Sequence, residues 1–352
     1  MRITRWRDVL RWGLRGLGAL TAFGLLLLVV TPLGRYLLRA GYEEARILLA
    51  RRRIEAMVAD SAVDGATRAK LQLVLEARAF AVDSLGLPAG ETFTRFTQLR
   101  SDTLVLLLSG ARADWLEPVL WRFPLVGRLP YKGFFRPADA LAAEAALRAR
   151  GFDTYLRPAS AFSTLGWFND PLLSTTLAQD SVNLVNTVIH ELTHNRYFAS
   201  GEATFNESFA NFVGARGAEA FFRARGDTLN ARRAVARWAD DRLLAAFWGQ
   251  LYRGLDSAFR AHPGDALRAR RIALRDSTYA AARRTLVDSL APLWMTIAPR
   301  YAERVPLDNA ALLARRVYLS DLEAFETDWQ AQGRDLRRTI DALIAAHRAR
   351  FD

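Results

Sequence analysis

The pattern with the clearest chemical meaning is HELTH at residues 190–194, two histidines four positions apart with a glutamate directly after the first. Residues four apart lie on one face of a helix, so the imidazoles of His190 and His194 can bind the same metal ion. Glu191 can take a proton from a water molecule that the metal activates. Apolar residues recur in steps of three and four over residues 182–197, which predicts the helix that this arrangement requires. Imidazole and carboxylate ligands in a chain without cysteine favour one Zn²⁺ ion.

Zinc held by two histidines needs a third protein ligand, and the candidates are few. The other two histidines, His262 and His347, lie far downstream in charged helical stretches. Glu202 follows a glycine and is expected to be solvated, whereas Glu207 begins an apolar-periodic run that predicts a second helix packed on the first. We therefore favour Glu207 as the third ligand and keep Glu202 as the alternative. The simpler explanations are two buried, hydrogen-bonded histidines and a first-turn carboxylate that only stabilises its helix.

Several separate stretches carry a resemblance to known peptidases. FNESFA, residues 205–210, resembles the second-helix motif of gluzincin peptidases, in which an Asn-Glu pair supplies the third zinc ligand. Most of the chain beyond the N-terminal segment is similar to a bacterial family of proposed aminopeptidases. The stretches that carry this second resemblance are WRFPLVGRLPYKGFF (121–135), FSTLGWFNDPLLSTTL (162–177), IHELTHNRYF (189–198), FNESFANFVGARG (205–217) and LDNAALLARRVYLSDLEAF (307–325).

The chain departs from that family in two places. Relatives often have cysteines near the Trp-x-Phe-Pro segment, where this chain has Arg122 and Arg128. Many relatives also carry a lipidated cysteine at the N-terminus, and this chain has no cysteine. The first departure leaves the expected chemistry unchanged, and the second changes how the protein is anchored.

The resemblance also implies residues that bind substrate. In gluzincins an edge strand before the zinc helix pairs with the substrate backbone, and we place it at GWFND, residues 166–170. Gly166, Trp167, Asn169 and Asp170 are therefore predicted to bind substrate, with Asn169 or Asp170 recognising an α-amino group. Asp170 followed by proline is equally typical of a turn or a helix start.

A tyrosine is expected to help stabilise the oxyanion, because gluzincins use a Tyr or His after the third ligand for this purpose. Tyr318 is the candidate catalytic residue and Tyr252 is the second choice. Asn309, in the same recurring segment as Tyr318, is a further predicted substrate-binding residue. Either tyrosine could instead be an ordinary core residue.

The net charge of +12 does not indicate a nucleic-acid partner. Residues 1–53 hold eleven arginines and three acids, so most of the excess positive charge lies near the N-terminus. Lys70 and Lys132 are the only lysines, which indicates a preference for arginine rather than a binding patch. With 352 residues, 51% of them apolar, the chain can bury a sizeable core.

The N-terminus predicts a membrane anchor. Five arginines precede GLGALTAFGLLLLVVTPLG, an uncharged stretch at residues 16–34. As one helix it would be about 28 Å long, enough to cross the hydrocarbon core of a bilayer. The positive-inside rule then places residues 1–15 in the cytoplasm and the catalytic domain in the periplasm, as a single-pass protein of the bacterial inner membrane. A buried core helix is the alternative interpretation.

The fold class expected is α+β, predominantly helical: a gluzincin-like zinc metallopeptidase domain with a small mixed sheet, preceded by the transmembrane helix. The extracytoplasmic domain would cover residues 35–352, with the zinc helices at about 181–224 and a helical C-terminal part at about 226–350. The other predicted elements are helices at 36–58, 66–85 and 137–150, strands at 92–99, 103–109 and 152–156, an ordered loop at 111–136, and long helices at 227–261, 266–295 and 308–350.

Three functions are compatible with these features. The first is a membrane-anchored zinc aminopeptidase, in which a zinc-activated water attacks the peptide bond and Glu191 is the general base. The second is a zinc endopeptidase that cleaves exposed protein segments. The third is a membrane protein that holds peptides without cleaving them. The residues themselves indicate a metallopeptidase, and the family resemblance adds the aminopeptidase activity. The sequence indicates no particular oligomeric state.

Overall fold

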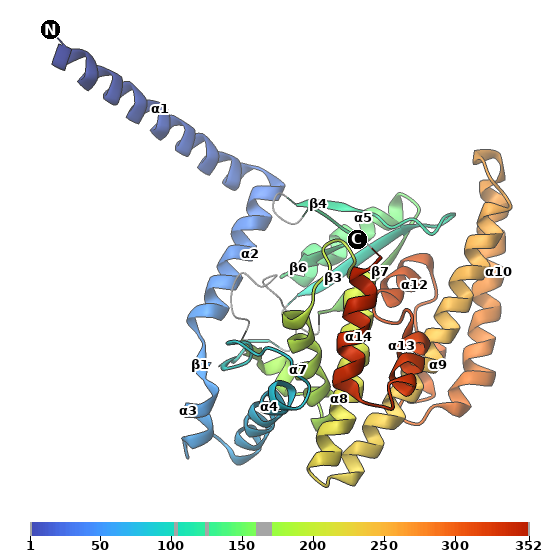
Figure 1. Ribbon diagram of the computed structural model, residues 1–352. Coiled ribbons are helices and arrows are strands. Elements are labelled where there is room, and N and C mark those ends of the chain that lie inside the picture. Colours follow the sequence, from blue (N-terminus) through green and yellow to red (C-terminus); the bar gives the residue numbers. More distant parts are fainter. Residues whose placement is uncertain (1, 102–104, 124–126, 160–170, 351–352) are drawn as a thin grey trace. The chain divides into compact units, whose positions relative to one another are not determined.

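The computed structural model describes residues 2–101, 105–123, 127–159 and 171–350. The chain divides into two compact units between Arg51 and Arg52. The first unit consists of two helices, α1 (Arg2–Val30) and α2 (Pro32–Leu49), drawn in blue in Figure 1. The second unit is mostly helical and contains small β-sheets, which makes it an α+β structure.

A local sequence signal separates α1 from α2. Pro32 stands at the start of α2, where its missing N–H costs no hydrogen bond. The Thr31 hydroxyl accepts a hydrogen bond from the backbone N–H of Gly34 at 3.0 Å, which caps the new helix. The uncharged stretch at residues 16–34 is therefore divided between two helices.

The predicted transmembrane helix is wrong. None of the helices in the described part of the chain is both long enough and apolar enough to span a bilayer. The uncharged part of α1 is limited to residues 16–30, about 22 Å of helix against a hydrocarbon core of about 30 Å. The sequence analysis had treated residues 16–34 as one helix, beyond the break at Thr31. The expected single-pass inner-membrane location depended on that helix and is wrong as well.

The helix predicted at 36–58 is also interrupted. Residues 52–53 form a short strand, β1 (Arg52–Arg53), and the chain becomes helical again in α3 (Ile54–Ala59). The next prediction, a helix at 66–85, is confirmed by α4 (Gly65–Asp83). Asp64 caps α4 by accepting the backbone N–H of Thr67 at 2.9 Å.

Three small sheets lie in the second unit. In the first, β2 (Arg95–Thr97) pairs antiparallel with β1 and parallel with β8 (Leu172–Leu173). In the second, β3 (Leu106–Arg112) lies between β6 (Tyr131–Phe134) and β7 (Phe152–Pro158), and both pairings are antiparallel. In the third, β4 (Trp121–Phe123) pairs with β5 (Gly127–Leu129). Helix α5 (Pro137–Ala149) packs its buried Ala140 and Leu147 against the β3 sheet.

The segment predicted as a loop at 111–136 therefore contains three strands. Each has three or four residues, too short for an alternating pattern to be recognised. The strand β6 is fixed by its register against β3, with Phe134 opposite Leu106 and Tyr131 opposite Ser109. This pairing is non-local, and it places Tyr131 on a sheet that the sequence did not reveal.

The remaining helices form the larger part of the second unit (Figure 1). Short 3₁₀ and π segments at 265–267, 285–290 and 291–293 connect some of them. The helices are α6 (Ser174–Leu177), α7 (Ser181–Arg196), α8 (Ala203–Ala224), α9 (Thr228–Arg260), α10 (Arg268–Arg284), α11 (Arg300–Arg304), α12 (Asn309–Arg316), α13 (Leu322–Ala331) and α14 (Leu336–Arg348).

The long helix predicted at 308–350 is divided into α12, α13 and α14. Asp321 has a φ of 57° before α13, and Gly333 and Arg334 have φ values of 68° and 64° before α14. Positive φ is incompatible with a continuing right-handed helix. The first break leaves Tyr318 in a turn between two helices.

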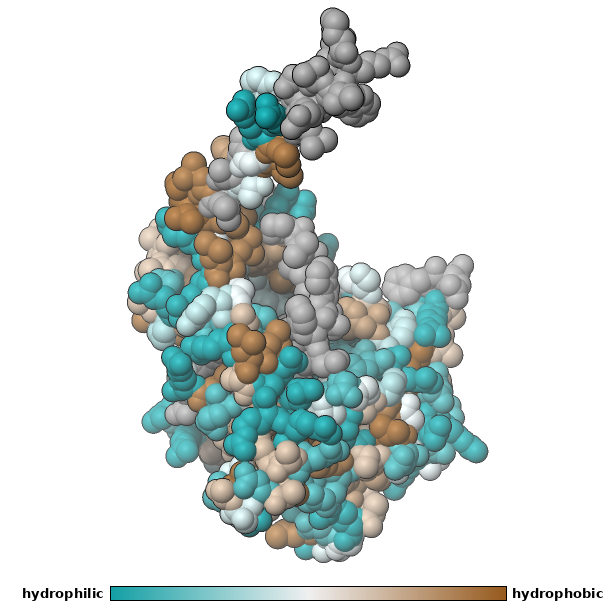
Figure 2. Space-filling view, turned by 90° about the vertical axis from the view of Figure 1, so that its left-hand side faces the viewer, coloured by the Kyte–Doolittle hydropathy of each residue, from teal (hydrophilic) through white to brown (hydrophobic). Residues whose placement is uncertain are grey.

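The main core gathers around α7 and α8. Helices α4, α9, α13 and α14 contribute to the same apolar cluster. A second cluster around Trp248, Phe259 and Leu312 joins α9 to α10 and α12. On the face drawn in Figure 2, hydrophilic side chains cover most of the lower body of the molecule, which is consistent with this division between interior and surface.

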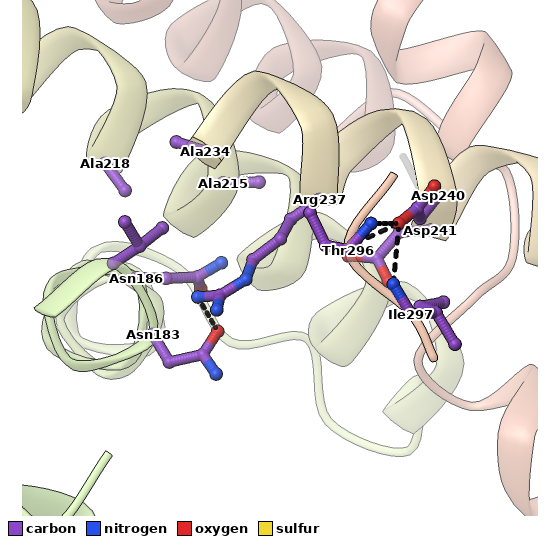
Figure 3. A pocket seen from close by; sticks show the side chains of 11 residues that line it. Asn183, Asn186, Ala215, Ala218, Ala234, Arg237, Asp240, Asp241, Thr296 and Ile297 are labelled. Carbon is purple, nitrogen blue, oxygen red and sulfur yellow. Dashed lines mark hydrogen bonds between the residues drawn. The ribbon is translucent and has the colours of Figure 1, made fainter. Parts of the chain in front are cut away.

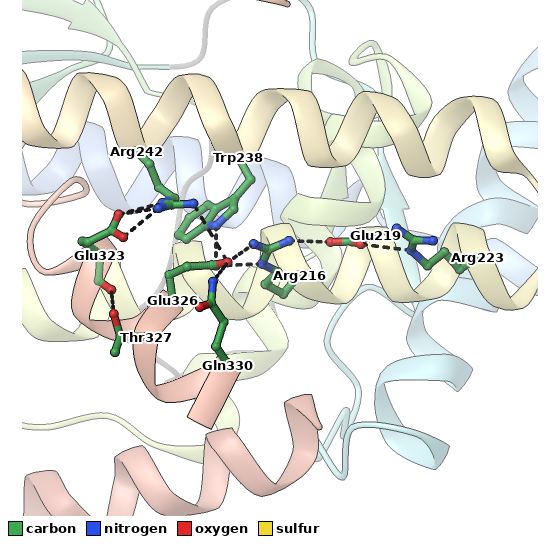
Figure 4. A network of polar contacts seen from close by, with 9 residues as sticks. All are labelled: Arg216, Glu219, Arg223, Trp238, Arg242, Glu323, Glu326, Thr327 and Gln330. Atoms are coloured by element: carbon green, nitrogen blue, oxygen red, sulfur yellow. Dashed lines mark hydrogen bonds and ion pairs between the residues drawn. The ribbon is translucent and has the colours of Figure 1, made fainter. Parts of the chain in front are cut away.

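A buried ion network joins α8, α9 and α13 (Figure 4). Arg216 donates hydrogen bonds to both carboxylate oxygens of Glu326, and its third nitrogen reaches Glu219 at 2.6 Å. The indole N–H of Trp238 donates to Glu326 at 2.9 Å. Burial raises the pKa of Glu326, but these hydrogen bonds and the charge of Arg216 outweigh it and hold the pKa below its usual value.

We predict that Glu326→Gln destabilises the protein by up to about 3 kcal/mol, because it leaves Arg216 buried with only Glu219 to balance its charge. Chemical denaturation measures the change. The matched control is Glu323→Gln on the same helix, where a carboxylate that is 71% exposed pairs with Arg242. That change should cost less than about 1 kcal/mol. Equal effects of the two substitutions would contradict the importance of the buried network.

Candidate metal centre

Helix α7 carries both histidines of the HELTH pattern. Its start is fixed by Asp180, whose side chain accepts the backbone N–H groups of Val182 and Asn183. Its apolar face is buried, so the register of the helix is set by the core. The helix predicted at 182–197 is confirmed, and His190 and His194 lie one turn apart on the same side.

Helix α8 carries Glu207, the third candidate ligand. The connection from α7 turns at Gly201, whose φ is 83°. The side chain of Asn206 spans this turn: its amide donates to the carbonyl of Ala199 at 2.7 Å and its oxygen accepts the N–H of Ala199 at 2.8 Å. Glu207 follows directly, in the first turns of α8. The asparagine of the Asn-Glu pair thus closes the loop that positions the glutamate.

The three side chains meet at one point. Nε2 of His190 lies 3.4 Å from one oxygen of Glu207, and Nε2 of His194 lies 3.8 Å from the other. One ligand atom from each residue lies within 4.8 Å of the other two. Ligands about 2.1 Å from a tetrahedral zinc ion are separated by about 3.4 Å. These spacings fit a zinc ion, and the group is able to hold a divalent metal.

The electrostatics of the three groups are coupled. Burial lowers the pKa of His190, but the hydrogen bond to Glu207 and the charges of Glu191 and Glu207 outweigh it, so the pKa is raised. Burial and the neighbouring His190 lower the pKa of His194 to about 4. Burial raises the pKa of Glu207, but His190 outweighs it, so that pKa is lowered. The charged form of His190 is therefore favoured beside the Glu207 carboxylate, while His194 is neutral at neutral pH.

The orientation of the His194 ring fits metal binding through Nε2. Nδ1 is buried and has no hydrogen-bond partner among the residues that the structure describes. Nε2 is the nitrogen that faces Glu207. When a neutral imidazole binds a metal through Nε2, its single proton is on Nδ1.

Three more polar side chains interact electrostatically with Glu207. Tyr318 lies in the turn after α12, and burial together with the charge of Glu207 raises its pKa to about 12. Arg157 of β7 hydrogen-bonds to Tyr318, stacks over its ring at 5.6 Å and interacts with Glu207. Tyr131 of β6 also interacts with Glu207. Burial of the Tyr131 hydroxyl and the negative charge of Glu207 both raise the pKa of Tyr131.

The sequence analysis missed Arg157 and Tyr131. Tyr131 stands in one of the recurring stretches, 121–135, which was a usable signal. Arg157 follows the strand predicted at 152–156. It lies two residues after Tyr155, so both side chains were expected on the same face of that strand. Both depend on pairing with β3, which the sequence alone did not establish.

The remaining predicted residues are placed as follows. Gly166, Trp167, Asn169 and Asp170 lie outside the described residues. Asn309 is fully buried: its amide donates to the carbonyls of Arg112, Ala113 and Trp115, and its oxygen accepts the hydroxyl of Tyr279 at 2.8 Å. These contacts occupy the amide within the protein, so a substrate-binding role for Asn309 is not carried further.

The alternative candidates lie elsewhere. Glu202 is exposed at the start of α8 and is not part of the group of three ligands. Tyr252 of α9 lies under the guanidinium of Arg316, 3.7 Å from it, and packs against the second apolar cluster. Glu191 neighbours His190 on α7 and contributes to its raised pKa.

The site thus belongs to the class in which two imidazoles and a carboxylate from adjacent helices can bind a divalent metal ion. Residues 35–350 match a family with the description "Putative aminopeptidase", so the chain belongs to that family. The family description makes peptide hydrolysis the expected activity and peptides the expected substrate. A search among curated proteins gave no match, and a search among solved structures gave none.

We predict that the purified protein binds one zinc ion per chain and that Glu207→Ala loses it. Removing a direct ligand should lower metal affinity by more than the roughly 10–100-fold cost of losing an outer-shell partner. Metal content by mass spectrometry and competition with a chelating dye measure the loss. Glu202→Ala is the control, because that carboxylate is exposed nearby and outside the group. A Glu207→Ala protein that keeps its zinc would place the third ligand elsewhere, with Glu202 the next candidate.

Proposed function

We propose that this protein is a zinc-dependent aminopeptidase. The observation that carries the proposal is the meeting of His190, His194 and Glu207 within 4.8 Å in a chain of this family. His190 and His194 would hold the ion through Nε2, and Glu207 through its carboxylate. A bound zinc ion would polarise the substrate carbonyl and lower the pKa of a water molecule.

Glu191 is the proposed general base. It follows His190 on α7, and its charge acts on that imidazole. From this position Glu191 takes the proton of the attacking water and passes a proton to the departing amine. Its place on a buried, capped helix keeps its distance from the ligands constant.

Tyr318 is proposed to stabilise the oxyanion that forms during attack. A pKa of about 12 keeps its hydroxyl protonated at neutral pH, so it remains a hydrogen-bond donor. Arg157 donates to the same hydroxyl, which leaves the O–H of Tyr318 to point elsewhere. Tyr131 is a second hydroxyl in the same surroundings.

We predict that Glu191→Gln keeps the zinc ion and lowers kcat by about 10²–10⁴-fold, because only the base is removed. Metal analysis and peptidase assays on the same preparation give the two readouts. Undiminished turnover would reject Glu191 as the base. Loss of the zinc together with activity would instead assign Glu191 to the maintenance of the metal site.

Aminopeptidase and endopeptidase activity differ in their need for a free substrate amine. We predict that N-acetylation of a peptide substrate abolishes its cleavage, because an aminopeptidase recognises the terminal ammonium group. Cleavage products identified by mass spectrometry decide the outcome, with the same peptide unmodified as the control. Equal cleavage of both peptides would establish an endopeptidase and reject the aminopeptidase proposal.

A further inference from the structure

The turn that carries Tyr318 follows directly on the end of a helix. Helix α12 ends just before it, and the chain turns there before α13 begins. The carbonyl groups at the end of a helix have no partner within that helix. The turn itself satisfies the carbonyl of Arg315, which accepts the backbone N–H of Tyr318 at 3.1 Å. The carbonyls of Val317 and Tyr318 are instead paired with side chains of α8.

Two side chains of α8 make these contacts. The hydroxyl of Ser208 donates to the carbonyl of Val317 at 3.1 Å and accepts the backbone N–H of Ser320 at 3.0 Å. The amide of Asn211 donates to the carbonyl of Tyr318 at 3.0 Å. These three hydrogen bonds join the backbone at Tyr318, and on both sides of it, to α8.

Both side chains stand close to a candidate metal ligand on their own helix. Ser208 directly follows Glu207, and Asn211 lies one turn further along the same face of α8 as Glu207. That face also contains Gly214, where a Cβ would lie 2.5 Å from Oδ1 of Asn186, so α8 packs tightly against α7 there. The turn is therefore attached to the part of α8 whose position sets the metal centre.

The side chain of Tyr318 is held separately, from the β3 sheet. Arg157 of β7 hydrogen-bonds to Tyr318 and lies over its ring, 5.6 Å from the ring centroid. Strand β7 pairs with β3 along the whole of β3, so Arg157 comes from a regular part of the fold. The backbone of Tyr318 is thus fixed by one element and its ring by another, which is the support that a precisely placed hydroxyl needs.

The two α8 side chains provide donors without adding charge. Serine and asparagine donate hydrogen bonds as neutral groups. A lysine or arginine at either position would also bind the carbonyls of the turn, but it would compete with a metal ion for the Glu207 carboxylate. The residue types at positions 208 and 211 therefore suit an attachment beside an acidic metal ligand.

A similar attachment elsewhere carries no side chain of the candidate centre. Asp240 of α9 accepts the backbone N–H groups of residues 295–297 and so holds that turn on its helix (Figure 3). The described residues that line the adjoining pocket of about 290 Å³ include none of the three candidate ligands. The attachment at Asp240 stabilises the fold, whereas the attachment to α8 also decides where Tyr318 lies.

We propose that Ser208 and Asn211 are positioning residues that hold the backbone of Tyr318 at a fixed place beside Glu207. The proposal rests on the peptidase function proposed above, in which the Tyr318 hydroxyl stabilises the oxyanion. A misplacement of about 1 Å in such a group can lower the rate by about 10²-fold. Loss of either side chain should therefore slow catalysis, although neither side chain touches the substrate.

The first experiment follows Tyr318 without catalysis. The full-length protein is labelled with meta-fluorotyrosine, and the fluorine resonance of Tyr318 is identified by its absence from Tyr318→Phe. Asn211→Ala and Ser208→Ala should each shift or broaden this resonance, because the turn loses hydrogen bonds to α8. The control is Asn195→Ala on α7, which should leave the resonance unchanged. The Asn195 amide donates to the carbonyl of Pro88, and 107 residues separate the partners in this pair as in the Asn211 pair.

The second experiment is a double-mutant cycle with Tyr318→Phe. Asn211→Ala should lower kcat by about 10–100-fold and change KM by less than about threefold, because the displaced hydroxyl acts in the transition state. In the Tyr318→Phe background the same substitution should change kcat by less than about twofold, because the hydroxyl is already absent. Asn195→Ala should leave kcat unchanged in both backgrounds.

Metal content separates positioning of Tyr318 from support of the metal site. Ser208→Ala and Asn211→Ala should bind zinc as the wild type does, because neither residue belongs to the group of three ligands. Loss of zinc in both variants would make these residues supports of the metal site and overturn the proposal.

Failure of the two proposals can be distinguished. A Tyr318 resonance that is unchanged in both α8 variants, or equal losses of kcat with and without the Tyr318 hydroxyl, would overturn the positioning role and leave the peptidase intact. Full activity of Tyr318→Phe would overturn the positioning role together with the oxyanion role of Tyr318. No cleavage of any peptide, with a Tyr318 resonance that depends on Ser208 and Asn211, would reject the proposed function and keep the attachment of Tyr318 to α8.

Discussion

The close approach of α7 and α8 is the constraint on which the rest of the structure depends. A Cβ on Gly214 would lie 2.9 Å from the backbone oxygen of Asn186, and one on Gly217 would lie 2.9 Å from Cγ2 of Ile189. A backbone atom cannot move aside as the end of a flexible side chain can, so a larger residue at 214 would separate the helices. Glu207 lies two turns before Gly214 on the same face of α8, so this separation also sets the distance from Glu207 to the histidines.

Buried arginines hold the helices around this pair. Arg216 joins α8 to α13 through Glu326, and Arg271 of α10 binds Asp114 at 2.7 Å and the carbonyls of His262 and Gly264. Part of the paired charges in the C-terminal half is buried, because guanidinium groups can bridge carboxylates and carbonyls in fixed directions. Each such pair fixes how the two segments are aligned along their axes as well as holding them in contact.

Local sequence patterns predicted the helices of the metal centre. The residues that the sequence did not reveal reach this site through contacts between distant segments. HELTH and the FNESFA run each lie within one helix, so periodicity was enough to place His190, His194 and Glu207. Arg157 and Tyr131 reach the same place only through strand pairing with β3, which is distant in sequence. The break at Thr31 was a local signal: Pro32 with a threonine before it marks a helix start, and hydropathy alone overlooked it.

The three candidate ligands already lie in positions that suit a metal ion. The hydrogen bond between His190 and Glu207 holds these two ligands together, and the low pKa of His194 keeps its imidazole neutral at neutral pH. Metal ligands must be free of protons, so an incoming ion competes with a proton for His190 more than for His194. The raised pKa of His190 and the lowered pKa of Glu207 show that each group favours the charged form of the other. This mutual stabilisation explains how a buried carboxylate can lie beside two imidazoles between α7 and α8.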